Sequence, residues 1–436
     1  MTAGGKPRLA LARIIELNVG FFGLQLSFGL VVANMSPVFR TLGASEAELP
    51  LLWLAGPITG LIVQPLIGAF SDRTVTRFGR RTPYLMAGAI LASLSLLLMP
   101  FSPVLWVAVM LLWVLDGANN IVLEPYRALV VDRLPDDQQS HGFLVQSAFT
   151  GLSQTLAHML PWLLASIVDR QLTTASGIPM TVRLAFALGA IITFSAILYS
   201  LVRVPEPPLN PAQRNALALA HPPARGISGD ILTALRELPP TMRQLALPML
   251  CQWYAMFAFW QFFADTLART QFGTDDPASP AYRDAILAAQ QLGTIYNFVA
   301  FIAALALIRL ARNLDTRRVH ATCLLIAGLA MVLIPLAPSM AVLRLLMIGI
   351  GIGWAGLMAN NHTLLARDLP AQRIGIYMGI FNIFVVVPML LESISMPFLF
   401  ENALAADPAR VLVFAGIIMN LGAVTILRVR TTRPRS

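Results

Sequence analysis

The chain has 436 residues, of which 57% are hydrophobic and only 12% are charged. Soluble proteins carry about 25% charged residues, so this composition excludes an ordinary soluble enzyme or binding protein. The formal net charge of +9 does not indicate nucleic acid as a partner, because the basic residues gather in the loops between apolar runs.

Apolar runs of about 20 residues recur along the whole chain, and this is the length of a transmembrane α-helix. The runs are too long and too uniformly apolar for the alternating strands of a membrane β-barrel. The sequence therefore predicts an all-α membrane protein with twelve transmembrane helices. Their ranges are 13–39, 50–70, 82–100, 104–130, 142–168, 183–203, 244–268, 284–309, 318–337, 340–366, 374–400 and 409–428.

The basic residues predict the orientation of the helices. With the N-terminus in the cytoplasm, 24 of the 31 lysines and arginines fall on the cytoplasmic side and 7 on the other. This is the positive-inside bias, and the opposite orientation would reverse it. We expect both termini in the cytoplasm and no cleaved signal. The large excess of arginine over lysine indicates a bacterial inner membrane. The external seven are Arg40, Arg170, Arg183, Arg269, Arg283, Arg344 and Arg410.

The longest polar interruption predicts a cytoplasmic linker between two halves. It contains VPEPPLNPAQRNALALAHPPARG, rich in proline and charge, with a short surface helix expected near 230–237. The expected domains are a six-helix bundle at 1–203, the linker at 204–243 and a second six-helix bundle at 244–436. Two such bundles are typical of the major facilitator fold, whose substrate site lies near the bilayer midplane.

The loop that follows the second predicted helix has the sequence GAFSDRTVTRFGRR, residues 68–81. A helix that ends in an acid, followed by a glycine turn and a basic cluster, can pair with other helix ends in one transporter state and release them in another. The alternative is that the arginines only anchor the cytoplasmic side. The pattern resembles the signature loop of the major facilitator superfamily and predicts gating roles for Asp72, Arg73, Arg80 and Arg81.

A narrower resemblance rests on four motifs. They are GLQLS (23–27), the stretch LLWLAGPITGLIVQPLIGAFSDRTVTRFGRRTPYL (51–85), WVLDGANN with the RAL that follows it (113–129), and GIYMGIFNIFVVVPMLLESI (375–394). These resemble the plant sucrose/proton symporters and their animal relatives in the glycoside–cation symporter group. The resemblance implies sugar transport.

Three departures from that group leave the sugar and the coupling open. Its plant members have Gly-Pro-Cys before Arg-Ala-Leu, where this chain has Glu124-Pro125-Tyr126. They carry a histidine in the first external loop, which is absent from SEAELP (45–50). They also carry an arginine in the outer half of the eighth helix, where this chain has AILAAQQLG (285–293).

Polar residues in the range 104–130 are the main candidates for the transport site. A charged aspartate at the bilayer centre costs about 2.5–3.5 kcal/mol and is normally functional. Asp116 shares one helical face with Asn119 and Asn120. A carboxyl group at low dielectric can gain and lose a proton near neutral pH, and amides can bind sugar hydroxyls. The alternative is a structural hydrogen-bond cluster. The resemblance implies that the matching aspartate couples the proton and contacts the sugar.

Further polar residues within the predicted helices are candidates for the same tasks. The amides are expected to bind substrate, although each could instead bridge two helices, and an aromatic belt is the alternative for Trp253. Glu392 is a second candidate proton site. Glu124 and Arg127 form a neutralising pair or a gate, and Asp265 could belong to an outer gate. The remaining substrate candidates are Gln25, Gln261, Asn297 and Asn382.

These patterns predict a secondary transporter and not an enzyme. No P-loop, metal-spaced Cys/His set or nucleophile motif is present in the sequence, so we expect no cofactor and no metal. We expect a monomeric proton-coupled symporter of a disaccharide or glycoside such as sucrose or maltose, with sugar, protons and the lipid bilayer as partners and no nucleic acid. The alternatives are a sodium-coupled sugar carrier, an efflux transporter of another small molecule, and a non-transporting sugar sensor.

Overall fold

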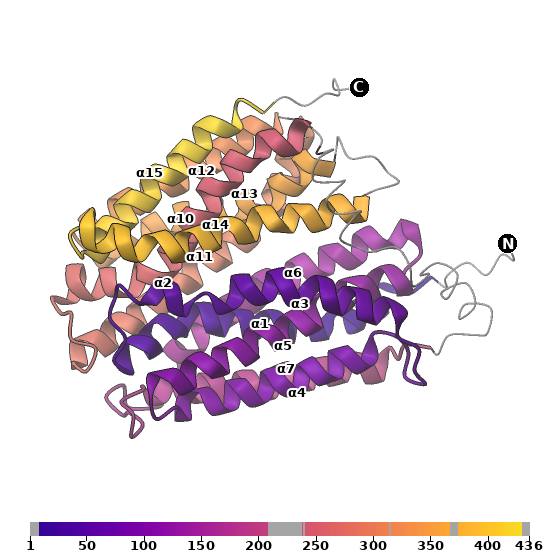
Figure 1. Ribbon diagram of the computed structural model, residues 1–436, viewed down its shortest axis with the longest axis horizontal. Coiled ribbons are helices and arrows are strands. Elements are labelled where there is room, and N and C mark those ends of the chain that lie inside the picture. Colours follow the sequence, from indigo (N-terminus) through magenta and orange to yellow (C-terminus); the bar gives the residue numbers. More distant parts are fainter. Residues whose placement is uncertain (1–7, 208–237, 239, 314, 367–373, 430–436) are drawn as a thin grey trace, which may run out of the picture. The chain divides into compact units, whose positions relative to one another are not determined.

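The computed structural model of the chain describes residues 8–207, 238, 240–313, 315–366 and 374–429. Helices dominate these residues (Figure 1), and within them β-structure is limited to two isolated bridges, Thr76 with Gly79 and Thr173 with Pro179. The all-α prediction is confirmed. The surface helix expected near 230–237 lies outside the described residues.

Each of the twelve predicted ranges contains one long helix. The apolar runs set their positions, because a helix satisfies every backbone group that lipid cannot. The long helices are α1 (Leu11–Thr41), α3 (Ala55–Arg73), α4 (Thr82–Leu98), α5 (Leu105–Arg133), α6 (Asp136–Leu164), α7 (Met180–Arg203), α10 (Pro240–Phe272), α11 (Pro280–Asn313), α12 (Thr316–Leu333), α13 (Met340–Ala366), α14 (Ile374–Asn402) and α15 (Pro408–Ile426). Short helices α2 (Leu49–Leu52), η1 (Met99–Phe101) and η2 (Ile334–Leu336) lie between them.

Ten stretches of the described residues are long and apolar enough to cross a membrane. The helices α6 and α10 are not among the ten. Glutamine, serine and threonine recur along α6, and α10 interleaves amides with tryptophan and tyrosine. Both compositions lower the hydropathy of a helix without shortening it. The count of twelve spans and the side of the termini stay predictions.

The predicted single helix at 50–70 is divided in the structure. The chain leaves helical geometry at Trp53 and Leu54, between α2 and α3. Pro57 explains the break, because a proline ring clashes with the carbonyl group four residues earlier, here that of Trp53, and supplies no N–H to bond it. The sequence pattern missed this break because both segments are equally apolar.

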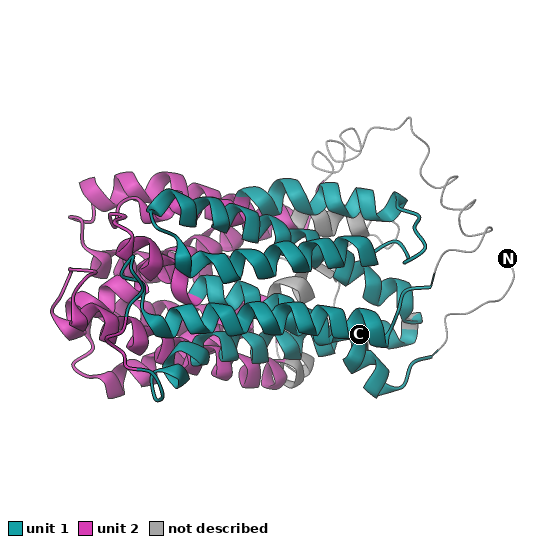
Figure 2. Ribbon diagram, turned by 90° about the horizontal axis from the view of Figure 1, so that it is seen from below, with its two compact units in different colours: residues 1–32, 58–168, 173–225 teal, residues 33–57, 169–172, 226–436 magenta. Residues whose placement is uncertain are grey.

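The chain forms two compact units (Figure 2). Unit 1 contains residues 1–32, 58–168 and 173–225, and unit 2 contains residues 33–57, 169–172 and 226–436. The end of α1 and the loop that follows it therefore belong to the same unit as α10 to α15. The six-plus-six division with a linker at 204–243 stays a prediction, since most of that linker lies outside the described residues.

Within unit 1, α1 packs closely against α5 and α7. The hydroxyl group of Tyr126 on α5 donates to the carbonyl oxygen of Leu17 at 2.6 Å. Thr193 on α7 donates to the carbonyl oxygen of Gly23 at 2.9 Å. A Cβ atom at Gly20 would lie 2.6 Å from the Tyr126 oxygen, so only glycine allows this approach. These contacts hold α1 beside the polar stretch of α5.

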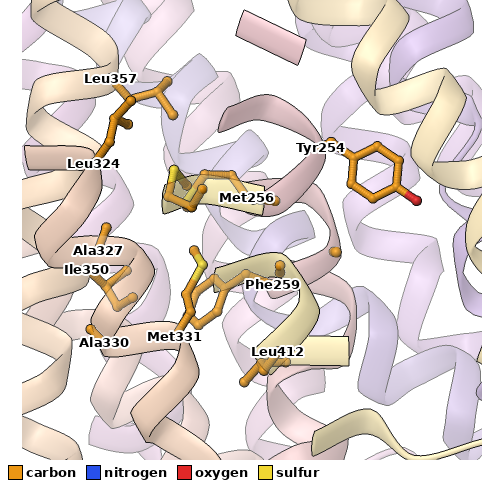
Figure 3. Packing of buried hydrophobic residues seen from close by; sticks show 14 of the residues in the cluster. Tyr254, Met256, Phe259, Leu324, Ala327, Ala330, Met331, Ile350, Leu357 and Leu412 are labelled. Carbon is orange, nitrogen blue, oxygen red and sulfur yellow. The ribbon is translucent and has the colours of Figure 1, made fainter. Parts of the chain in front are cut away.

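Within unit 2, a large apolar cluster joins α10 to α12, α13 and α15 (Figure 3). Met256 and Phe259 on α10 meet Met331 on α12, Ile350 on α13 and Leu412 on α15 in this cluster. All five side chains are almost completely buried. Two polar side chains of α10 make contacts with other helices: Gln261 bonds Glu392 on α14, and Asp265 bonds Tyr282 on α11.

Candidate functional site

Asp116 lies near the middle of α5, in unit 1. Its residue surface is 4% exposed. Its carboxylate makes no hydrogen bond and no ion pair with any other residue in the described part of the chain. A buried carboxylate without a partner is energetically costly, which makes Asp116 a candidate functional residue.

The two asparagines that follow Asp116 on the same face are held from two other helices. Ser27 on α1 donates to Asn119 Oδ1 at 3.0 Å. On α3, Thr59 accepts from Asn120 Nδ2 at 3.0 Å, and Gln64 donates to Asn120 Oδ1 at 2.5 Å. No local pattern in the sequence indicates these partners, because they lie far apart along the chain.

Part of this polar cluster is left without a partner. The Nδ2 atom of Asn119 is buried and makes no hydrogen bond within the described residues. An unpaired buried donor costs about 1–3 kcal/mol, and a ligand acceptor would remove that cost. Gln25 on α1 is half-buried, and its side-chain amide makes no hydrogen bond to the described residues. The structure thus joins Asn119 and Asn120 in one cluster beside Asp116, without a bond from Gln25.

Unit 2 contains a second buried carboxyl group. Glu392 on α14 is fully buried and accepts a hydrogen bond from Gln261 Nε2 on α10 at 3.1 Å. Glu392 Oε1 and Gln261 Oε1 are buried without a hydrogen-bond partner in the described part of the chain. Nearby along the same helices, Tyr254 bonds Ser395 at 2.8 Å. Glu392 therefore has an amide contact that Asp116 lacks.

The remaining predicted substrate contacts are spread over unit 2. Trp253 packs edge to face on Trp354, with ring centroids 5.9 Å apart, and its indole N–H is buried without a hydrogen-bond partner among the described residues. Asn297 donates to the carbonyl oxygen of Gly293 on its own helix at 3.0 Å. Asn382 is half-buried near the start of α14. The structure joins none of these three to Gln261 by a hydrogen bond.

The loop between α3 and α4 forms a charged cluster in unit 1. Arg81 is 4% exposed and contacts Asp72 at 2.5 Å and Asp132 at 3.0 Å. Arg80 contacts the same Asp132 oxygen at 2.8 Å, and Ser71 accepts from Arg81 at 2.6 Å. Three of the predicted gating residues, Asp72, Arg80 and Arg81, therefore meet at the end of α5, while Arg73 is exposed.

Glu206 is a partner of this loop that sequence reasoning missed. One of its carboxylate oxygens accepts from the backbone N–H groups of Arg81 at 2.8 Å and Thr82 at 3.1 Å. It thereby caps the start of α4, where Arg81 supplies no side-chain cap. Gly79 has φ +99°, and a Cβ atom there would meet the Glu206 carboxylate at 2.3 Å. Glu206 lies in a proline-rich stretch, and the sequence there predicted only a linker.

The structure also places the three remaining residues that were predicted to act in gating. Arg127 and Glu124 form an ion pair at 3.1 Å across one turn of α5, with both side chains partly exposed. Asp265 on α10 accepts from the Tyr282 hydroxyl group at 2.7 Å and contacts Arg40 at 3.3 Å.

Among the residues searched, no group of three or more histidines, cysteines or acids is placed to hold a metal ion.

Comparison with known proteins identifies the family to which this fold belongs. Residues 17–391 match the Major Facilitator Superfamily. The chain belongs to this superfamily. It is a multi-pass membrane protein of a transporter family and not an enzyme, as the sequence predicted.

Among curated proteins, this member of the superfamily is similar to plant and fungal sugar transporters. It is 24% identical over 332 residues to sucrose transport protein SUT5 of Oryza sativa subsp. indica, covering 68% of this chain and 60% of the rice protein. It is 26% identical over 318 residues to sucrose transport protein SUC4 of Arabidopsis thaliana, covering 67% and 62%. The general alpha-glucoside permease of Schizosaccharomyces pombe is 29% identical over 173 residues, 36% of this chain and 31% of that protein. The matched part is therefore less than two thirds of each relative.

Solved structures agree with this fold. A variant of nucleoside transporter NupG superimposes with a TM-score of 0.72 at 13% identity, covering 96% of this chain and 99% of that one. A variant of peptide transporter POT, crystallised with sulfate, gives 0.67 at 14% identity, covering 95% and 93%. At such low identity these likenesses show the fold alone. The predicted major facilitator fold is confirmed.

Proposed function

We propose that this protein is a proton-coupled symporter of a disaccharide or related glycoside, working by alternating access in a bacterial inner membrane. The observation that carries the proposal is the buried Asp116 carboxyl group, which has no counter-charge in the described structure. A group in this position favours its neutral form at low dielectric. Proton binding and release at Asp116 can therefore be tied to the conformation of the transporter and to the ligand beside it.

The amides near Asp116 support a hydroxyl-rich ligand. An amide both donates and accepts hydrogen bonds, as sugar hydroxyl groups do. The unpaired Asn119 Nδ2 offers one donor, while Asn120 is positioned by Thr59 and Gln64. We assign Asn119, Asn120 and Gln25 as substrate contacts of unit 1. An efflux pump for an apolar compound would have little use for this set of donors.

Unit 2 offers its own candidate contacts. The Gln261–Glu392 pair leaves two buried oxygen atoms able to accept from hydroxyl groups. Aromatic faces suit the apolar C–H faces of sugar rings, and this supports Trp253 as a contact. We assign Gln261, Asn297 and Asn382 to the same role and keep Glu392 as the second candidate proton site.

The names of the relatives support the substrate class. Those proteins are named as sucrose transport proteins and an alpha-glucoside permease. The charged cluster of Asp72, Arg81 and Asp132 supports alternating access, since such contacts can be made in one state and broken in another. We propose Asp72, Arg73, Arg80, Arg81, Glu124, Arg127 and Asp265 as gating residues, in a monomeric carrier.

The test is uptake of labelled sucrose, maltose and related glycosides into proteoliposomes. For one proton per sugar, a difference of about one pH unit, acid outside, supports about tenfold accumulation. Accumulation should disappear with a protonophore and should not occur with a sodium gradient alone. Equal uptake driven by sodium would establish the sodium-coupled alternative. No sugar uptake under either gradient would contradict the proposal.

A further inference from the structure

The loop between α1 and α2, residues 42–48, contains a buried acid that the proposed transport site does not use. Glu46 is only 6% exposed, although it lies in a short loop between two helices. Its neighbour Glu48 is exposed and accepts from the Ser45 backbone N–H and hydroxyl group, both at 2.8 Å. The two acids of this loop therefore have opposite environments.

Both oxygens of Glu46 contact arginines from other elements of unit 2. Arg269 on α10 contacts Oε2 at 2.7 Å, and Arg40 at the end of α1 contacts Oε1 at 3.4 Å. Arg269 also donates to the carbonyl oxygen of Ala406, between α14 and α15, at 3.1 Å. Arg40 also donates to the carbonyl oxygens of Ala44 at 2.7 Å and Asp275 at 3.4 Å. Loop 42–48 is thus joined to α1 and α10.

A second carboxyl group shares this charged cluster. Asp265 on α10 contacts Arg40 at 3.3 Å and accepts from Tyr282 on α11 at 2.7 Å. Its other oxygen is buried and has no hydrogen-bond partner among the described residues. Two acids, two arginines and one phenol therefore meet in one largely buried cluster. We name these five residues, Arg40, Glu46, Asp265, Arg269 and Tyr282, the loop cluster.

The surroundings of Glu46 act in opposite directions on its proton affinity. Burial and the nearby Asp265 carboxylate raise the pKa of Glu46, Arg269 and Arg40 lower it, and the net result is a pKa of about 7. The pKa of Glu48 is instead lowered by its hydrogen bonds to Ser45. The free-energy cost of removing a carboxylate from water can exceed its attraction to its charged partners, as is general for buried ion pairs.

We propose that Glu46 is a proton-binding site and that its protonation stabilises the packing of loop 42–48 against α1 and α10. When the loop is released into water, the pKa of Glu46 returns to its ordinary value of 4.5. The packed arrangement then holds the proton more tightly than the released one, so acid favours packing. This stabilisation is fully present below pH 4.5 and is lost as the pH rises through about 7.

This site differs in position and in task from Asp116. It belongs to a loop that the charge bias places on the outer side, where a proton-driven carrier meets the more acidic solution. The outer solution would then control how long the loop stays packed. The inference concerns the empty protein and does not depend on which compound is transported.

The test is hydrogen–deuterium exchange of peptides covering residues 42–54 in the purified, unliganded protein, corrected for the intrinsic pH dependence of exchange. Between about pH 5.5 and 8, the protection of the wild-type loop should fall on the order of tenfold and should level off near pH 7. Glu46→Gln should remove the pH step and leave the loop protected throughout.

Two further variants complete the design. Glu48→Gln is the matched control in the same loop and should keep the wild-type step. Arg269→Gln removes the cation nearest to Glu46 and should move the pH at which the protection levels off to a higher value. If the wild-type protection does not change with pH, or if Glu46→Gln keeps the step, the proposal is overturned. If Glu46→Gln does not fold, the proposal is overturned when the protection of Arg269→Gln levels off at the same pH as that of the wild type.

Discussion

Two aspartates on the same helix, Asp116 and Asp132 of α5, have opposite surroundings. Asp132 lies at the helix end with its side chain 27% exposed, and it contacts both Arg80 and Arg81. Asp116 lies at mid-helix, 4% exposed, with no partner for its carboxylate in the described structure. A compensated charge fixes a contact between helices. A buried carboxylate without a counter-charge can instead bind a proton or a ligand.

Glu392 falls between these two cases. It is as deeply buried as Asp116, but the Gln261 amide donates to one of its oxygens. A neutral amide offsets less of a negative charge than an arginine does. The three acids therefore form a series of decreasing compensation, from Asp132 through Glu392 to Asp116, and the predictions below separate its members.

The largest effect is expected for Asp116→Asn. The amide is nearly isosteric but cannot release a proton, so sugar accumulation should fall from about tenfold per pH unit to none. Exchange of labelled for unlabelled sugar should persist, because the contacts of Asn119 and Asn120 are unchanged. Gradient-driven uptake and exchange are measured side by side in proteoliposomes. Wild-type accumulation in this variant would remove the functional distinction between Asp116 and Asp132.

Changes at the end of α5 that contains Asp132 should affect stability. Arg81→Gln removes a buried cation that contacts Asp72 and Asp132, and the two acids retain partial exposure. We expect a loss of roughly 2–4 kcal/mol, which lowers the melting temperature of the purified protein. The control is Arg73→Gln, an exposed arginine of the same loop, which should change stability by less than about 0.5 kcal/mol. Equal melting temperatures in both variants would show that the cluster does not stabilise the protein.

A smaller effect is expected for Gly79→Ala. The left-handed backbone at φ +99° disfavours any side chain, and the new Cβ atom would displace the Glu206 cap from α4. We expect a cost of roughly 1–3 kcal/mol in thermal unfolding. Gly68→Ala, on α3, is the control, because a Cβ atom there meets no neighbour within 4 Å. A destabilised control with an unaffected Gly79→Ala would contradict this role of the turn.

The smallest effect is expected for Asn120→Ala. Loss of one amide contact should weaken sugar binding by about fivefold to tenfold, equivalent to about 1–1.4 kcal/mol, while proton coupling is retained. Asn18→Ala removes a buried amide that bonds only its own helix at Ile14, and it should leave affinity unchanged. Binding is measured by calorimetry on the purified variants. An equal loss of affinity in both would indicate a general packing effect.

The sequence predicted what depends on local pattern. Runs of about 20 apolar residues placed the long helices, and the cost of burying Asp116 singled out that position before any contact was known. The spacing of Asn119 and Asn120 put them on the same face. These inferences need only the period of the helix and the polarity of the residues.

Contacts between distant segments could not be predicted in this way. Glu206 caps α4 from more than a hundred positions away, and Glu46 meets Arg269 from a loop that looked merely polar. No pattern in the sequence near Glu46 or Glu206 identifies the residues that it contacts. The break between α2 and α3 was missed for a different reason, because Pro57 stops the helix without changing its hydropathy.

The central claim is that Asp116 carries the coupling proton, and sugar-evoked proton movement tests it most directly. Proteoliposomes hold a pH-sensitive dye, and sugar is added outside without any imposed gradient. Wild-type protein should acidify the lumen as protons enter with sugar, and Glu392→Gln should do the same. Asp116→Asn should exchange sugar while the lumen pH stays constant. Lumen acidification by Asp116→Asn, together with its loss in Glu392→Gln, would contradict the account and assign the proton to Glu392.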